Sequence, residues 1–171
     1  YKRQELIQSE TKKSMPIISK IEKPQAIEKL ESILKVSDGL MVARGDLGLE
    51  IPAEEVPINQ KIMVEMAKKA RKPIIVATQM MESMINNLTP SRAEVNDVAN
   101  SVMDGADCIM LSAETSVGKY PCEVVRKIGK IISSVENTKI GLVKKRKVNI
   151  RKDRLITNSI CYNAAMLADG I

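Results

Sequence analysis

Histidine, phenylalanine and tryptophan are absent from the 171-residue sequence, and aromatic residues make up only 2% of it. Without histidine, the chain cannot build a zinc site of the Cys/His type or use an imidazole as a general acid or base. Without large rings, the core must be aliphatic, and ten methionines are available to fill it. No apolar run approaches the roughly 18 residues that a membrane span needs, so we expect no membrane partner.

Cysteine is also scarce, and Cys108, Cys122 and Cys161 show no paired spacing. Scattered cysteines between apolar neighbours are typical of reduced thiols, so we predict a cytoplasmic protein. The chain begins at Tyr1 instead of a methionine. We therefore expect it to be the interior of a longer protein.

The net charge of +6 is concentrated in one segment. Residues 137–154 hold eight of the 27 Lys and Arg residues and one of the 21 acidic residues, so the rest of the chain is nearly neutral. No aromatic side chain lies among these basic residues to stack on bases. We interpret 137–154 as a solvated linker and predict no nucleic-acid partner. A basic, non-enzymatic binding module centred on 144–152 is the alternative.

Four short apolar runs are spaced along the chain before this linker. They are MPIIS (15–19), GLMVA (39–43), PIIVAT (73–78) and DCIMLS (107–112). Each is rich in branched residues, too short for a helix and not alternating, which is typical of strands buried on both faces. Strand–helix units at this spacing indicate an α/β protein with a parallel sheet. The sheet is either doubly wound or part of a (β/α)8 barrel, since a whole barrel needs roughly 250 residues.

Four amphipathic helical patterns follow these runs, over residues 24–36, 58–70, 89–105 and 121–136. In the second pattern, apolar residues recur every four positions at Ile58, Ile62, Met66 and Ala70, which predicts a stripe that faces the core. In the third, Thr89 or Ser91 can cap the helix, and Ser91 with Glu94 fits a capping box. Gly105 ends that helix.

A further helical pattern ends at Gly170. We therefore divide the chain into a sheet domain over 1–136, a linker over 137–154 and the start of another domain over 155–171.

Polar residues stand at the end of every predicted strand. They are Lys20 and Glu22 at the first, Arg44, Gly45 and Asp46 at the second, Thr78 and Gln79 at the third, and Ser112, Glu114 and Thr115 at the fourth. Because the carboxyl ends of parallel strands meet at one rim, these side chains should gather where α/β proteins bind their ligands.

Two carboxylates at neighbouring strand ends, Glu22 and Asp46, can hold a hard divalent cation together with water or substrate oxygens. Lys20 beside them can stabilise negative charge on a phosphoryl or enolate oxygen. Simpler interpretations remain open: Glu22 and Asp46 are two ordinary surface acids, Lys20 only forms an ion pair with Glu22, and the Thr78 hydroxyl only caps the next segment. The sequence has no P-loop and no dinucleotide-binding glycine motif. The residues alone thus predict a metal-dependent enzyme with an anionic substrate and do not select its reaction.

Four long motifs narrow this choice. They are IISKIEKPQAIEKLESIL, DGLMVARGDLGLEIPAEEVPINQK, KPIIVATQMMESMI and TPSRAEVNDVANSVMDGADCIMLSAETSVGKYP. Together they resemble the pyruvate kinase family, strongly over 15–136 and more weakly over 137–171. The resemblance implies the second half of a (β/α)8 TIM barrel, a linker and the first helix of an α/β C-terminal domain. It also implies the glycolytic transfer of a phosphoryl group from phosphoenolpyruvate to ADP, which gives pyruvate and ATP.

The resemblance assigns roles to individual residues. It implies that Glu22 and Asp46 hold Mg²⁺ or Mn²⁺, and that Lys20 lies against the transferred phosphoryl group. It places the substrate carboxylate on the backbone around Ala43, Gly45 and Asp46. Thr78 would contact that carboxylate and help to deliver a proton, and Ser112 and Glu114 would belong to the water chain behind it.

The same resemblance implies a K⁺ site outside this chain, a homotetramer at full length, and a fragment that is inactive alone. A metal-dependent lyase or aldolase of the phosphoenolpyruvate/pyruvate barrel type is the alternative enzyme. The motifs ATQMMES and LSAET favour the kinase.

Overall fold

The structure is a computed structural model that describes residues 9–10 and 15–138. The chain splits into two units, Tyr1–Ile140 and Gly141–Ile171, and the described residues belong to the first. The predicted linker beyond residue 138 and the predicted helix in 155–171 lie outside the described residues. The proposed division of the chain at these positions therefore stays a prediction.

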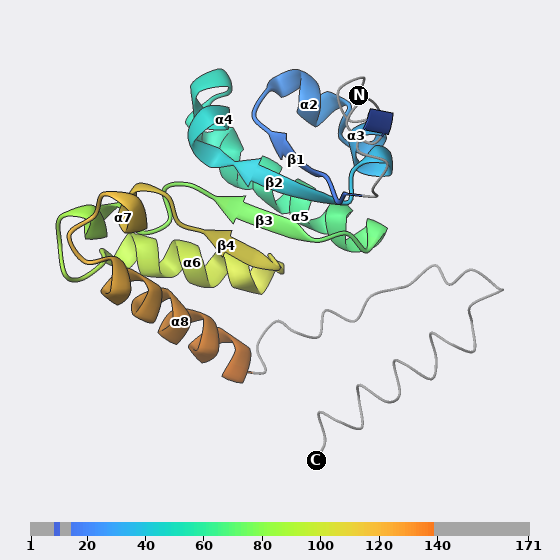
Figure 1. Cartoon of the computed structure of the whole chain (residues 1–171). Coiled ribbons are helices and arrows are strands. Elements are labelled where there is room, and N and C mark those ends of the chain that lie inside the picture. Colours follow the sequence, from blue (N-terminus) through green and yellow to red (C-terminus); the bar gives the residue numbers. More distant parts are fainter. Residues whose placement is uncertain (1–8, 11–14, 139–171) are drawn as a thin grey trace, which may run out of the picture. The chain divides into compact units, whose positions relative to one another are not determined.

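Four parallel strands form one sheet in the order β1-β2-β3-β4 (Figure 1). Their bounds are Ile18–Ile21, Gly39–Ala43, Ile74–Ala77 and Cys108–Met110. The order in space equals the order along the chain, whereas a doubly wound sheet reverses its order at a switch point. Among the described strands there is no such reversal, which favours the barrel alternative over the doubly wound one.

Helices follow each strand at the predicted places, and the structure also contains short helices that were not predicted. The α-helices are α2 (Pro24–Glu28), α3 (Leu30–Val36), α4 (Arg44–Glu50), α5 (Val56–Ala70), α6 (Arg92–Asp104), α7 (Ala113–Ser116) and α8 (Pro121–Asn137), and the 3₁₀ helices are η1 (Ala53–Glu55) and η2 (Glu82–Ile85). The helix predicted over 24–36 is divided at Lys29. In the part of the chain that the structure describes, no helix has the length and hydropathy to cross a membrane.

The predicted ends of α6 are confirmed. Ser91 is its N-cap, and Ser91 and Glu94 form both hydrogen bonds of the capping box. Gly105 follows the last turn with a φ of 100°, which glycine adopts without steric cost.

The apolar stripe predicted for α5 is wrong except at Met66, which is partly buried against the core. Ile58 is 61% exposed and Ile62 is 44% exposed. The buried residues of the helix are instead Gln60, Met63, Val64 and Ala67. Gln60 belongs to the buried face because its amide donates to the Ser101 hydroxyl at 3.3 Å. A prediction made from apolar residues alone misplaced the stripe, because the buried face includes the polar residue Gln60.

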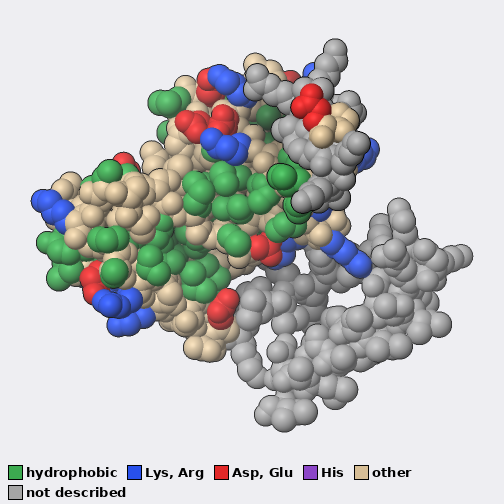
Figure 2. Space-filling model, viewed as in Figure 1, with side chains coloured by type: hydrophobic (Ala, Val, Ile, Leu, Met, Phe, Trp, Pro, Cys, Tyr) green, Lys and Arg blue, Asp and Glu red, His purple; other side chains and the backbone are tan. Residues whose placement is uncertain are grey.

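The hydrophobic core lies between the helices and one face of the sheet. It contains Leu40, Val42, Ile74 and Val76 from the strands together with Met63, Val64 and Ala67 from α5. The opposite face is only partly covered: Met41, Ile75 and Met110 are half-buried, and Ile18 is exposed. Figure 2 shows apolar side chains gathered over this face. The prediction that the strands are buried on both faces is therefore confirmed for most of β2 and β3. It is wrong for β1 and β4, which are the edge strands among the described residues.

Candidate functional site

The carboxyl ends of the strands carry the candidate site. Short helices begin there, with α4 directly after β2 and α7 shortly after β4 (Figure 1). The first strand lies further along the chain than predicted, because Ile17 donates its amide to the Asp38 carboxylate at 2.7 Å and pairing with β2 begins at Ile18. Lys20 is therefore inside β1, and Glu22 is the residue that follows the strand.

Lys20, Glu22 and Asp46 come together at the ends of β1 and β2. The Lys20 ammonium group forms an ion pair with the Glu22 carboxylate and lies 3.7 Å from Oδ2 of Asp46. The hydrogen bond and the charge of Glu22, with a smaller contribution from Asp46, raise the pKa of Lys20 above its ordinary value. The ion pair considered from the sequence is thus present, and Lys20 is a cation shared by two carboxylates.

The same three groups allow a test of whether a divalent cation fits here. Two carboxylates already converge on one positive charge, and carboxylate oxygens are the ligands that Mg²⁺ and Mn²⁺ prefer. Within the described ranges, no group of three or more acidic, cysteine or histidine side chains could hold a metal. Glu22 and Asp46 therefore suit a hard cation only if other oxygens complete its coordination.

The segment after β2 is a helix that was not among the predicted helical patterns. Helix α4 begins at Arg44, and its N-cap, Ala43, has no side chain to accept a hydrogen bond from the first turn. The Gly45 amide donates to the Thr78 hydroxyl at 2.8 Å instead. Thr78, which follows β3, thus caps the start of α4 after the neighbouring strand β2. The sequence had suggested a cap on the segment that follows Thr78 instead.

Glycine at position 45 allows this contact. A Cβ there would lie 3.2 Å from Oγ1 of Thr78, closer than ordinary van der Waals contact. Because Oγ1 accepts from the amide, the hydroxyl hydrogen of Thr78 is left to donate to another group. Thr78 is therefore held in place and still able to act as a donor.

Glu114 lies in α7, which follows β4, and is only 2% exposed. Its carboxylate accepts hydrogen bonds from the Ser112 amide at 2.8 Å and from the Met81 amide at 3.3 Å. The contact with Met81 joins α7 to the loop after β3. The structure thus brings Ser112 and Glu114 together and connects them to the strand that carries Thr78.

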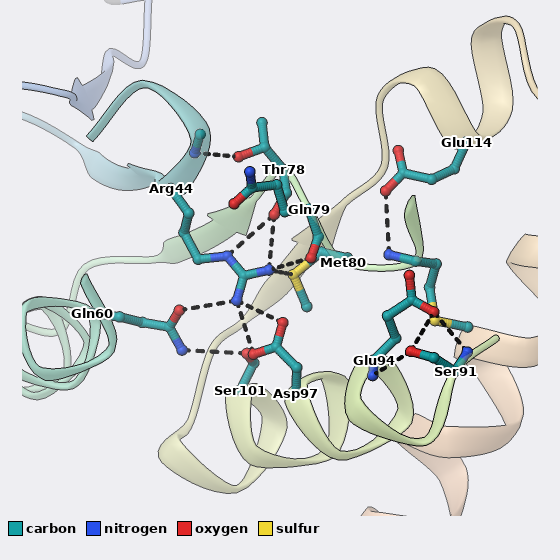
Figure 3. Close-up of polar contacts among 12 residues, drawn as sticks. Arg44, Gln60, Thr78, Gln79, Met80, Ser91, Glu94, Asp97, Ser101 and Glu114 are labelled. Carbon is teal, nitrogen blue, oxygen red and sulfur yellow. Dashed lines mark hydrogen bonds and ion pairs between the residues drawn. The ribbon is translucent and has the colours of Figure 1, made fainter. Parts of the chain in front are cut away.

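The prediction from the sequence missed one functional side chain at this rim, that of Arg44. The Arg44 guanidinium is buried, at 8% exposure, and contacts the carbonyl groups of Thr78 and Gln79 (Figure 3). The sequence placed Arg44 after the second strand but gave it no role. An arginine between a strand of apolar residues and a glycine is the signal that could have indicated burial.

Comparison with known proteins decides the family. Residues 2–125 match the family described as "Pyruvate kinase, barrel domain". The chain belongs to the pyruvate kinase family. Over 123 residues it is 58% identical to a pyruvate kinase of Mycobacterium intracellulare, an alignment that covers 72% of the chain and 26% of the relative. A pyruvate kinase of Thermotoga maritima is 57% identical over 124 residues, with 72% and 27% covered.

A third relative extends the match slightly. A pyruvate kinase of Corynebacterium efficiens is 55% identical over 130 residues, covering 76% of the chain and 27% of the relative. The family predicted from the motifs is therefore confirmed, and the lyase alternative is set aside. The chain spans about a quarter of the length of the curated pyruvate kinases that it matches.

Proposed function

We propose that this chain supplies part of the active site of a pyruvate kinase, which transfers the phosphoryl group of phosphoenolpyruvate to ADP and gives pyruvate and ATP. The family membership supports this reaction. The observation that carries it is the Lys20 ammonium group between the carboxylates of Glu22 and Asp46. Phosphoryl transfer depends mainly on positioning and charge neutralisation, which such a cluster supplies.

Glu22 and Asp46 would hold Mg²⁺ or Mn²⁺. That ion, when bound, supplies positive charge next to the phosphoryl oxygens. Lys20 supplies a further positive charge on the same rim and stabilises the negative charge that grows on the enolate oxygen as the phosphoryl group leaves.

The second half of the reaction is a proton transfer to the terminal carbon of the enolate, which becomes the methyl group of pyruvate. Thr78 is suited to help deliver this proton, because its hydroxyl is held by the Gly45 amide and can still donate. The backbone of Ala43, Gly45 and Asp46 would receive the substrate carboxylate beside that hydroxyl. Ser112 and Glu114 would connect the donor to solvent through water.

The remaining proposals concern the whole enzyme. The four sequential strands would be the second half of a (β/α)8 barrel, with a C-terminal domain beginning after the linker. The other half would supply the K⁺ site and most of the ADP site. The complete enzyme would be a cytoplasmic homotetramer with no nucleic-acid or membrane partner.

An assay of a complete pyruvate kinase that contains this chain tests the proposal. With phosphoenolpyruvate and ADP, we expect ATP and pyruvate in equal amounts. Lys20→Met should lower kcat about 10²- to 10³-fold, the cost of losing one charge at the reacting group, and leave Mn²⁺ affinity unchanged. Lys23→Met is the matched control, because Lys23 pairs with Glu50 on the surface. Pyruvate without ATP, or equal effects of the two substitutions, would contradict the proposal.

A further inference from the structure

Two consecutive residues at the end of β3 have an unfavourable backbone conformation. Thr78 and Gln79 have φ angles of 68° and 54°, in the left-handed region. This region is sterically unfavourable for an L-amino acid, and a β-branched residue such as threonine is a rare occupant. A pair of such residues persists only where surrounding groups determine the conformation.

The side chain of Arg44 binds both carbonyl groups of this pair (Figure 3). Its Nε and Nη2 donate to the Thr78 carbonyl at 3.1 and 2.8 Å, and Nη2 donates to the Gln79 carbonyl at 2.8 Å. The planar guanidinium group can reach two converging carbonyls at once, whereas a lysine ammonium group is a single point charge.

The opposite edge of the guanidinium group is held by α6. Nη1 donates to both carboxylate oxygens of Asp97, at 2.8 and 2.7 Å. Gln60 on α5 adds a longer contact to Nη1 at 3.5 Å, and its own amide is oriented by the hydroxyl of Ser101. Because a buried arginine needs a paired carboxylate, Asp97 fixes where the guanidinium group lies.

Thr78 is therefore held at two points by one stretch of α4. Its carbonyl is bound by the Arg44 side chain, and its hydroxyl is bound by the amide of the next residue, Gly45. A shift of the carbonyl would turn the Thr78 backbone and move the hydroxyl away from Gly45.

We propose that Arg44, held by Asp97, is a positioning residue that keeps Thr78 and Gln79 left-handed and so sets the Thr78 hydroxyl for the proton transfer to the enolate. This inference rests on the proposed role of Thr78 in the proton transfer, and Arg44 acts only through Thr78. A misplacement of about 1 Å at a reacting group can cost about 10²-fold in rate. Loss of the guanidinium fork should therefore slow the proton transfer more than it affects the metal.

The test uses a complete pyruvate kinase that contains this chain and the variant Arg44→Lys. Exchange of the methyl protons of pyruvate with deuterated water, followed by NMR, reports the proton transfer without ADP. We expect Arg44→Lys to slow this exchange about 10- to 100-fold, to leave Mn²⁺ affinity within about twofold, and to speed hydrogen exchange at the Gly45 amide. Arg126→Lys on α8 is the matched control, because Arg126 is exposed and pairs with Glu123, and it should leave all three unchanged.

Two further variants complete the design. Gln79→Gly in the Arg44→Lys background should restore part of the lost rate, because glycine adopts a positive φ without cost. Asp97→Asn keeps the shape but removes the charge that holds Arg44, so it should give a smaller loss in the same direction, and it carries the test if Arg44→Lys does not fold.

The outcomes separate this inference from the proposed function. A parent enzyme that neither exchanges pyruvate protons nor forms ATP would overturn the proposed function. An active parent in which Arg44→Lys matches Arg126→Lys would overturn the positioning role alone. Equal losses in proton exchange and Mn²⁺ affinity would also overturn it, since they would show a general structural defect.

Discussion

At the scale of single residues, the candidate site was predictable where strand ends bring charges together. Lys20 lies near the end of β1, and Glu22 and Asp46 follow β1 and its parallel neighbour β2; the structure confirms that the three side chains meet. The role of Arg44 was not predictable, because it depends on carbonyl groups that a positive φ turns toward the guanidinium group. A threonine in the left-handed region opposes its own propensity, so no local pattern indicates it.

The hydroxyl of Thr78 gives a prediction at this scale. Thr78→Val removes the donor and leaves the Gly45 amide without its acceptor. In a complete pyruvate kinase containing this chain, it should slow the exchange of pyruvate methyl protons by about 10²-fold or more, the usual contribution of a positioned acid or base. Thr78→Ser is the matched control, because it keeps the hydroxyl and should retain most of the rate. Similar rates in the two variants would show that the hydroxyl plays no part in the proton transfer.

At the scale of elements, the beginning of α6 depends on one carboxylate. Glu94 accepts hydrogen bonds from the amides of Ser83 and Ser91 at 2.7 Å each and also from both of their hydroxyl groups. Burial alone would raise the pKa of Glu94, but these hydrogen bonds outweigh it and the pKa is lowered. A carboxyl group with a lowered pKa in the folded state stabilises that state above its unfolded pKa, and the contribution is lost as the pH falls through the folded value.

Glu94→Gln should therefore destabilise the N-terminal turn of α6 by about 1 kcal/mol at pH 7, a typical value for a lost cap. The difference from the parent should shrink as the pH falls from the ordinary glutamate pKa through the lowered pKa of Glu94 in the folded parent, where its carboxyl becomes protonated. The measurement is the free energy of local opening from amide hydrogen exchange. Glu123→Gln in the first turn of α8 is the control, because Glu123 has only a surface ion pair with Arg126. A difference that does not change with pH would show that the charge of Glu94 is not involved.

The C-terminal end of α3 depends on a lysine from outside the helix. The Lys72 ammonium group donates to the carbonyls of Leu34, at 2.6 Å, Lys35 and Ser37. Lys72→Met leaves these carbonyls without a charged donor and should lower the free energy of opening of α3 by roughly 1–2 kcal/mol. Lys69→Met, which removes only a surface pair with Glu65, should change it by less than about 0.5 kcal/mol. Equal effects would mean that Lys72 does not cap the helix.

Whether a helix forms was easier to predict than which of its faces is buried. Both ends of α6 could be predicted, because the capping box and Gly105 are local sequence signals for the start and the end of a helix. The buried face of α5 was predicted wrongly, because Gln60 is buried by partners on α6 and α4 that lie far away in the sequence. Helix α4 was missed because its cap, Thr78, comes from another strand.

At the scale of the whole molecule, the described sheet has two edges and one half-covered face. Strands β1 and β4 each pair on one side only, and Met41, Ile75 and Met110 lie half-buried on the open face. Parallel sheets are normally covered on both faces. The sequential strand order favoured the barrel, and the half-covered face is what a half-barrel would present to the remaining strands.

The purified 171-residue chain should therefore show no transfer from phosphoenolpyruvate to ADP. The reason is that four strand ends contribute to the rim in the part of the chain that the structure describes, and the proposed ADP site lies mostly outside them. A coupled assay of ATP formation measures this, with a complete pyruvate kinase containing the same chain as the positive control. Turnover by the isolated chain would show that the proposed division of the active site is wrong.

The most direct measurement is the Mn²⁺ affinity of a complete pyruvate kinase that contains this chain, compared with its Glu22→Gln and Asp46→Asn variants. If both carboxylates hold the same ion, each substitution should weaken binding at least about 10-fold, since even the groups that only orient metal ligands contribute that much. Glu31→Gln should have no effect, because Glu31 pairs with Lys35 on the surface of α3. Unchanged affinity in both the Glu22 and the Asp46 variant would contradict a shared metal site beside Lys20.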